Sequence, residues 1–259
     1  MKNFEPPRHQ GTKRVGVLGA LVSWWFILFV LLLGWLFATP YFAPLYATLF
    51  PGTDPPVYQG DTLFDLFLWQ ALVVIAASAA AILLGVGAGA FVTRDAGRDF
   101  RAGANMLATI GQTFPPVALL AIAVPAIGYG FWPTFIALAL YGVLPILANT
   151  IAGIEAVSPA ARDAARGMGM TPGQILRQVE LPLALPVILA GVRTAVVIDI
   201  GTAALGSTVG ADTLGTPIID GLVVDKLAYV IQGGVAVALM AIVADLAFER
   251  LQRRATRYL

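Results

Sequence analysis

Residues 102–154 read AGANMLATIGQTFPPVALLAIAVPAIGYGFWPTFIALALYGVLPILANTIAGI and contain no Asp, Glu, Lys or Arg. A hydrocarbon core of about 30 Å needs roughly 20 helical residues to cross it, so this stretch is long enough for two crossings. The segment 128–133 contains two glycines and a proline, and it is the natural place for the turn between them. The stretch therefore predicts two membrane-spanning helices.

Four further apolar runs flank this stretch, at about 15–38, 66–92, 183–205 and 227–246. The first run has a signal peptide as its alternative, but it is too long for the apolar core of one and no convincing cleavage site follows it. The runs together predict an all-α membrane protein with six transmembrane helices. Its expected parts are an N-terminal tail at 1–14, a membrane domain at 15–249 and a C-terminal tail at 250–259.

The composition excludes several classes of function. Hydrophobic residues make up 58% of the 259 residues and charged residues 12%, which does not suit a soluble domain. The net charge of +1 gives no support to a nucleic-acid partner. Cysteine is absent and His9 is the single histidine, so thiol nucleophiles and Cys/His zinc sites are excluded. There is no Gly-Lys dipeptide and hence no phosphate-binding loop, so we expect a non-catalytic chain without a cofactor of its own.

Lysine and arginine are distributed unevenly between the two sides of the expected membrane domain. Fourteen of the sixteen lie in four segments, namely 1–14, 93–101, 155–182 and 250–259. Loops rich in Lys and Arg stay on the cytoplasmic side. The count therefore predicts that both termini and the loop 155–182 are cytoplasmic.

The loop 155–182 has the sequence signals of two short helices joined by a turn. Ser158 followed by Pro159 is typical of a helix start, and Gly167 and Gly169 are typical of a helix end. A helix–turn–helix of this kind, lying on the membrane surface with small residues at its turn, suits close docking of a cytoplasmic protein.

The second helix of this loop has its own start and stop signals. Thr171 and Gln174 have the spacing of a capping box, so the helix is expected to restart there. Leu181 and Pro182 are expected to end it before the run at 183–205, because the residue before a proline disfavours the helical conformation.

The same loop resembles the EAA motif of permease subunits of binding-protein-dependent ABC importers, the MetI-like family. That pattern is Glu-Ala-Ala, three residues, Gly, nine residues, then Ile-x-Leu-Pro. This chain has Asp163-Ala164-Ala165, three residues, Gly169, nine residues, then Val179-Glu180-Leu181-Pro182. The spacing is kept, and the departures are Asp163 for Glu and Val179 for Ile.

The resemblance implies a role and a set of partners. In that family the motif forms a coupling helix in a groove of the ATPase subunit. The implied coupling residues are Asp163, Ala164, Ala165, Gly169, Leu181 and Pro182. The implied partners are ABC ATPase subunits that carry ATP and Mg, a second permease subunit, identical or homologous, and a periplasmic or lipid-anchored substrate-binding protein. The implied place is the lipid of the bacterial inner membrane, where the first helix wraps the neighbouring subunit.

Three further segments, 111–118, 141–145 and 208–215, are similar to the glycine betaine and osmoprotectant branch of this family, as found in enteric bacteria. That similarity implies import of a quaternary-amine osmolyte such as glycine betaine, choline or carnitine, by alternating access. Two alternatives stay open: a permease for amino acids or another small polar solute, and a proton-coupled secondary transporter.

Charges and breaks inside the apolar runs are candidates for the substrate pathway. Asp199 either lines the pathway and attracts a cation or serves as a structural group. Arg193 is expected to snorkel or to bond to the backbone. Pro115 and Pro116, after Gln112, place a break in the third span whose freed carbonyls can line a pathway, with a simple kink as the alternative. The glycine-rich segment 204–221 is expected to be an irregular outer loop.

Overall fold

The computed structural model describes the backbone of residues 11–111 and 113–257 and the side chains of residues 24–111 and 113–256. All regular elements in these ranges are helical. The helices are α1 (Gly11–Ala38), α2 (Ala43–Leu49), α3 (Leu63–Val92), α4 (Arg101–Gly111), α5 (Pro116–Ile127), α6 (Phe131–Glu155), α7 (Pro159–Gly167), α8 (Pro172–Ile175), α9 (Leu181–Ala203), α10 (Thr216–Val223) and α11 (Leu227–Arg257). Short 3-10 turns lie at Thr39–Phe42, Asp95–Phe100 and Ala204–Val209, and a π-helical turn lies at Leu176–Glu180.

Five of the expected six spans are present as long apolar segments. In the described part of the chain, the segments able to cross a membrane are Trp24–Leu49, Leu63–Val92, Phe131–Glu155, Pro172–Val209 and Leu227–Thr256. The positions of the expected apolar runs are thereby confirmed, although the helices extend beyond the runs at several ends, since a helix continues into the interface where the run of apolar residues stops.

The expected third span is a bent pair of helices. The segments Asp95–Gly111 and Pro116–Ile127 meet at an angle of 99°, and they make a sixth span only if the pair crosses as one unit. Pro115 has the extended conformation that a following proline favours (φ −64°, ψ 128°), and Pro116 opens α5. The predicted break at the two prolines is therefore confirmed, and it is much sharper than a proline kink. Gln112 lies outside the described residues.

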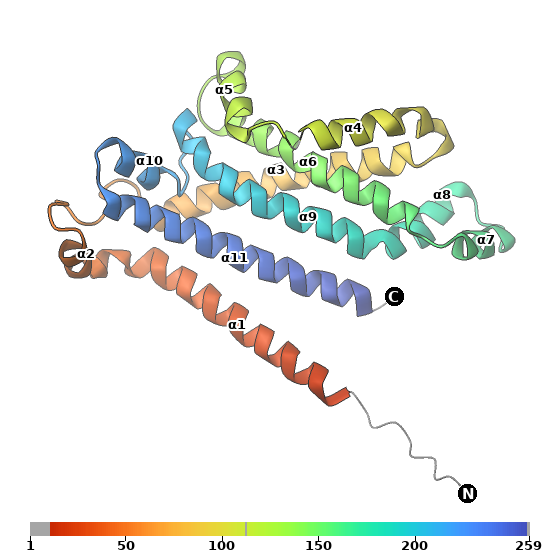
Figure 1. Cartoon of the computed structure of the whole chain (residues 1–259), viewed down its shortest axis with the longest axis horizontal. Helices are drawn as coiled ribbons and strands as arrows, with labels where there is room; N and C mark the ends of the chain where they lie inside the picture. Colours follow the sequence, from red (N-terminus) through yellow and green to blue (C-terminus); the bar gives the residue numbers. More distant parts are fainter. Residues whose placement is uncertain (1–10, 112, 258–259) are drawn as a thin grey trace, which may run out of the picture.

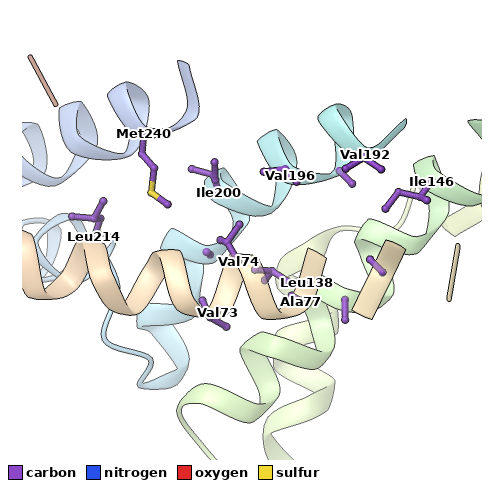
Figure 2. Packing of buried hydrophobic residues seen from close by; sticks show 14 of the residues in the cluster. Val73, Val74, Ala77, Leu138, Ile146, Val192, Val196, Ile200, Leu214 and Met240 are labelled. Atoms are coloured by element: carbon purple, nitrogen blue, oxygen red, sulfur yellow. The ribbon is translucent and has the colours of Figure 1, made fainter. Parts of the chain in front are cut away.

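The long helices α3, α6, α9 and α11 run side by side and form the body of the molecule (Figure 1). Helix α1 contacts α11 and diverges from it toward the N-terminal end of α1. The core between them is lined by aliphatic side chains such as Val74 of α3, Leu138 of α6, Ile200 of α9 and Met240 of α11 (Figure 2). Between helices surrounded by lipid, such packing stabilises through close van der Waals contact rather than through removal of apolar area from water.

Small residues let α3 and α6 approach closely. A Cβ atom added at Gly85 would lie 2.8 Å from Ile146 Cγ2, and one added at Gly89 would lie 2.7 Å from Thr150 Cβ. Both distances are too short for real side chains, so these two positions require glycine at the present helix separation. Gly87, in contrast, has no atom within 4 Å of an added Cβ and faces away from α6.

The two ends of the bundle differ in structure. Helices α7 and α8 lie at one end, together with the turn between α3 and α4, while α2 and α10 lie at the other (Figure 1). We call the first the cytoplasmic end and the second the outer end, as the distribution of Lys and Arg predicts. The outer segment 204–221 is not irregular throughout, as the sequence suggested, because it contains a 3-10 turn and most of α10.

Candidate functional site

The first helix of the cytoplasmic loop begins and ends where its sequence signals predict. Ser158 Oγ accepts a hydrogen bond from Ala161 N at 3.3 Å, and Pro159 is the first residue of α7. The helix ends at Gly167, and Gly169 adopts a left-handed conformation with φ +78°. The predicted helix and its glycine stop are confirmed.

The second helix starts as predicted but does not stop at Leu181. Gln174 N donates to Thr171 Oγ1 at 3.4 Å and Thr171 N donates to Gln174 Oε1 at 2.8 Å, which completes the capping box. Beyond α8 the chain passes through the π-helical turn directly into α9, with Leu181 N donating to Leu176 O. The expected stop at Leu181 and Pro182 is wrong, because the wider π turn adapts the backbone to a proline, whose missing N–H is tolerated in the first turn of α9.

Of the motif residues, Ala165 is buried and Leu181 is partly buried, while the others are exposed. Asp163 and Ala164 are exposed on α7, and a Cβ atom added at Gly169 would meet nothing within 4 Å. Asp163 Oδ1 pairs with Arg166 Nη1 at 3.0 Å on the surface. Ala165 is buried beneath them. The structure thus brings the first part of the motif together as an open surface at the cytoplasmic end, while Leu181 and Pro182 lie at the base of α9.

Glu180 is a functional candidate that the sequence reasoning missed. Its side chain is only 4% exposed, yet it lies 2.7 Å from Arg94 Nη1 and 2.7 Å from Arg162 Nε. The sequence signal for it is a single acidic residue at the variable position of the motif. Arginine is frequent both in the loop 155–182, which contains the motif, and in the loop 93–101. The pairing itself needs the fold, because Arg94 follows α3 and Arg162 belongs to α7.

A cleft of about 1110 Å³ opens beside this ion pair at the cytoplasmic end. It lies between the turn after α3, the end of α6 and the α7–α8 loop. Its charged lining consists of Arg94, Asp95, Arg98, Arg101, Glu155, Arg162, Arg166 and Glu180. The excess of arginine gives the cleft a positive character that favours acidic groups on whatever docks there.

Asp199 lies on α9 in the middle of the bundle, facing α3 and α6. Its side chain is fully buried, and Oδ2 accepts a hydrogen bond from Ser78 Oγ at 3.2 Å. Oδ1 has no hydrogen-bond partner among the described residues. Gly142 on α6 leaves the room for this carboxyl group, since a Cβ added there would lie 3.1 Å from Oδ2. In this conformation Asp199 therefore reaches no surface of the single chain.

Arg193 neither snorkels nor bonds to the backbone, so that expectation is wrong. Its Nε and Nη2 donate to Asp245 Oδ1 and Oδ2 at 2.5 Å and 2.6 Å, in a bidentate ion pair between α9 and α11. Asp245 lies within the last apolar run, and the sequence reasoning overlooked it as an intramembrane charge. Opposite charges within apolar membrane helices are expected to pair with one another, and these two belong to adjacent helices.

The two prolines of the break lie at the start of α5, where Pro115 is exposed and Pro116 is partly buried. The prolines belong to α5, whereas Asp199 on α9 faces Ser78 of α3 and Gly142 of α6, so these described pathway candidates belong to different elements. The exposed face of the bent pair carries apolar side chains, among them Met106, Leu107, Phe114, Val117 and Ile122.

At the outer end, Gln70 ties the segment after α9 to α3. Gln70 Nε2 donates to Ile200 O at 3.1 Å and Leu214 N donates to Gln70 Oε1 at 3.0 Å, with the Gln70 side chain fully buried. Because Leu214 is held in this way, the neighbouring Asp212 is placed beside the outer turns of α3, next to Trp69.

This arrangement forms two adjoining outer cavities that share Trp69 and Asp212. One has a volume of about 510 Å³, and its polar lining consists of Asp61, Asp65 and Asp212. The other has a volume of about 170 Å³ and adds Phe131 to the lining. The outer end therefore combines carboxylates with aromatic rings.

A fourth outer carboxylate, that of Asp220, lies outside the lining of these two cavities and is engaged within the chain. Asp220 Oδ2 accepts a hydrogen bond from Tyr58 Oη at 2.7 Å. Burial raises the pKa of Tyr58 above its ordinary value, and the bond to Asp220 raises it further. The phenol thus stays a hydrogen-bond donor, and it joins the segment before α3 to α10.

Comparison with known proteins gives consistent matches. The model of the family described as binding-protein-dependent transport system inner membrane component matches residues 81–257. The chain is 41% identical over 165 residues to the osmoprotectant import permease protein OsmY of Salmonella typhimurium, covering 64% of this chain and 70% of that one. It is 43% identical over 150 residues to the choline transport system permease protein OpuBB of Bacillus subtilis, covering 58% and 69%. It is 40% identical over 197 residues to the carnitine transport permease protein OpuCD of Listeria monocytogenes, covering 76% and 86%.

Solved structures agree with this at the level of the fold. An inward-facing structure of the MetNI methionine ABC transporter has a TM-score of 0.66 and 21% sequence identity, covering 74% of this chain and 95% of that one. At this identity, the likeness concerns the arrangement of helices alone.

Proposed function

Because the chain belongs to the family of binding-protein-dependent transport system inner membrane components, and is thus a permease subunit of an ABC importer, we propose that its substrate is a quaternary-amine osmolyte of the glycine betaine, choline and carnitine class. In this proposal two permease subunits, identical or homologous, form the pathway at their interface. ATP and Mg bind to separate ATPase subunits, and a periplasmic or lipid-anchored binding protein delivers the substrate. Alternating access then moves it across the bacterial inner membrane.

The observation that carries the substrate class is the agreement among the relatives. Permeases named for osmoprotectant, choline and carnitine transport are each about 40% identical to this chain. The methionine transporter is 21% identical and shares the helix arrangement only. This difference favours the quaternary-amine class over amino acids.

The outer cavities support the same class on physical grounds. A quaternary ammonium group has no N–H to donate, so it is recognised by aromatic faces and by diffuse negative charge. Trp69 and the carboxylates of Asp61, Asp65 and Asp212 supply both in one place. We infer that these residues receive the cationic head of the substrate when the binding protein releases it.

The cytoplasmic loop supports the proposed coupling role. Asp163, Ala164 and Gly169 form an open surface of small side chains that an ATPase subunit can approach closely. Leu181 and Pro182, at the other end of the motif, open α9 and so connect the docking surface to a helix of the bundle. The charge distribution supports a cytoplasmic location for this end and for both termini.

The pathway residues stay a proposal: Gln112, Pro115, Pro116 and Asp199. For Asp199, which is buried between α3, α6 and α9, lining the pathway requires those helices to part during alternating access. Pro115 is already exposed at the break and needs no such movement.

The test is ATP-dependent uptake of labelled glycine betaine into vesicles that carry the reconstituted complex with and without this chain. We expect uptake to require the chain and to be inhibited by excess choline but not by a neutral amino acid. Inhibition by the amino acid alone would favour the amino-acid permease. Uptake driven by a proton gradient in the absence of ATP would instead favour the secondary transporter.

Replacing Trp69 with leucine is expected to lower choline uptake about fivefold at saturating binding protein, because a cation–π contact contributes about 1 kcal/mol. Trp69→Phe keeps an aromatic face and should retain most of the activity. Uptake rates of the two variants, normalised to the amount of assembled complex, make the comparison. If the Trp69→Leu variant and the unmodified chain had equal uptake rates, Trp69 would be an aromatic residue of the membrane interface and not a substrate contact.

Replacing Asp199 with asparagine is expected to reduce uptake of a cation several-fold while the complex assembles normally. The substitution keeps the shape and the hydrogen bond from Ser78 but removes the ionisable group. Ser78→Ala is the matched control, since it removes the hydrogen bond and keeps the acid. Unchanged uptake kinetics in Asp199→Asn would make Asp199 a structural residue.

A further inference from the structure

Glu180 is a charged group in a place where an isolated charge would be costly. Its side chain is 4% exposed, and Glu180 is the last residue of the π-helical turn that precedes α9. A buried carboxylate is retained only where charged or hydrogen-bonding partners offset its desolvation. The partners of Glu180 therefore have to come from neighbouring elements.

Two arginines from different parts of the chain provide them. Arg162 of α7 lies with Nε 2.7 Å from Oε1 and donates a hydrogen bond to it. Arg94, which follows α3, lies with Nη1 2.7 Å from Oε2 as an ion pair, without the geometry of a hydrogen bond. Both arginine side chains are less than one-third exposed, so solvent screens these pairs only partly.

Arg162 also binds the end of α6. Its Nη2 donates to the carbonyl oxygen of Ile154 at 2.5 Å. One buried carboxylate and two guanidinium groups thus join α7 to the ends of α3 and α6 and to the start of α9. We call Arg94, Arg162 and Glu180 the cytoplasmic ion cluster.

Helix α9 begins directly after Glu180 and is part of a longer continuous helical segment. Residues Pro172–Val209 form one continuous helical segment of 38 residues from the docking loop to the outer end. The segment carries Asp199 in the bundle and contacts α3, α6 and α11 along its length. A displacement of α8 therefore moves α9 directly, whereas α7 is separated from it by the turn at Gly169.

We propose that Glu180 is a positioning residue for coupling: by pairing with Arg162 it fixes α7 to the base of α9, so that both helices of the docking loop move as one body when the ATPase subunits close. This inference rests on the proposed ATP-driven import. Without the cluster, α7 would follow the movement of the ATPase subunit, but this movement would not be transmitted to α9. The measurable consequence is ATP hydrolysis that no longer drives transport.

The experiment compares substrate molecules transported per ATP hydrolysed in the full reconstituted complex, for the unmodified chain and for Glu180→Gln. Glutamine keeps the size of the side chain and removes the charge. We expect normal assembly, continued ATP hydrolysis and a transport-to-hydrolysis ratio about tenfold lower. Glu180→Asp, which restores the charge, should recover part of the ratio, and this recovery is not expected if only side-chain packing matters.

Two further variants complete the design. Arg162→Gln leaves Glu180 paired with Arg94 but releases α7 from Glu180. It should therefore lower the transport-to-hydrolysis ratio as Glu180→Gln does. If the Glu180→Gln complex fails to assemble, the ratio of Arg162→Gln tests the inference in its place. Glu249→Gln is the matched control, because Glu249 forms its ion pair with Arg253 of its own helix, at 2.6 Å, and lies outside the cytoplasmic ion cluster. Its ratio should equal that of the unmodified chain.

The outcomes separate this inference from the proposed function. An unchanged ratio in both Glu180→Gln and Arg162→Gln overturns the inference. A parallel fall of uptake and hydrolysis, equal in Glu180→Gln and Glu180→Asp, also overturns it, because the residue is then needed for structure alone. If the unmodified complex itself shows no uptake linked to ATP hydrolysis, the proposed function fails instead.

Discussion

Replacing Gly169 with arginine is expected to reduce ATP-dependent uptake to the background level, while the protein still inserts into the membrane. Gly169 has φ +78°, and a Cβ atom there meets nothing within 4 Å in this chain. The long side chain therefore finds room in the isolated subunit but projects from the surface on which we place the ATPase. Uptake by vesicles and the amount of inserted protein are the two measurements.

The controls separate docking from backbone strain. A residue with a Cβ at this φ destabilises the turn by about 1 kcal/mol, whereas asparagine tolerates the left-handed conformation better. Gly169→Asn should therefore fold as the unmodified chain does, and Gly167→Ala adds a methyl group to the same loop, also with open space around it. Near-normal uptake by these two variants, with none by Gly169→Arg, supports docking at this turn. Normal uptake by Gly169→Arg would show that no partner approaches it.

Removing either partner of the Arg193–Asp245 pair is expected to destabilise the protein by about 2–3 kcal/mol, because the remaining charge is left unpaired between two membrane helices. Both oxygens of Asp245 are engaged, at 2.5 Å and 2.6 Å. Arg193→Leu or Asp245→Leu should lower the midpoint of thermal aggregation in detergent by at least about 5 °C.

The double variant distinguishes a charge effect from a packing effect. With both charges replaced by leucine no unpaired group remains, and apolar replacements of buried ion pairs are often neutral. We therefore expect the double variant to be more stable than either single variant. If the midpoint of the double variant fell by as much as the two single variants together, an unpaired charge would not be the cause of the lost stability. Thr194→Val, at the exposed neighbouring position, is the control.

The expectations that were confirmed rest on short-range physics. The crossing segments follow from the length of the charge-free runs, because each helix must satisfy its own backbone in lipid. The start of α7 at Ser158 and the capping box of Thr171 and Gln174 depend on atoms three residues apart. The break at Pro115 follows from local sterics. The helix caps and the break are complete within about one turn of chain, and each crossing segment depends on a single uninterrupted apolar run, so both can be predicted from consecutive residues.

The failed expectation for Arg193, and the residues that were missed, involve partners far apart along the chain. Arg193 and Asp245 are 52 residues apart, Ser78 and Asp199 are 121 apart, and Gln70 and Leu214 are 144 apart. Which helices are neighbours decides each of these pairs. A pattern of charges in one apolar run contains no information about the run that packs against it, so the sequence predicts snorkelling or a backbone bond for Arg193 and does not reveal Asp245 as its partner.

The amino-acid sequence by itself determined the membrane class, the positions of the helices, the helix–turn–helix of the cytoplasmic loop and, through the motif from Asp163 to Pro182, the family. Only the tertiary structure decided the 99° bend between α4 and α5, the burial of Asp199 and the cluster of Glu180 with Arg94 and Arg162. The physical reason is that apolar length and helix capping are properties of consecutive residues. The tertiary packing of helices from distant parts of the chain instead determines the ion pairs, the close glycine contacts and the direction of the bend.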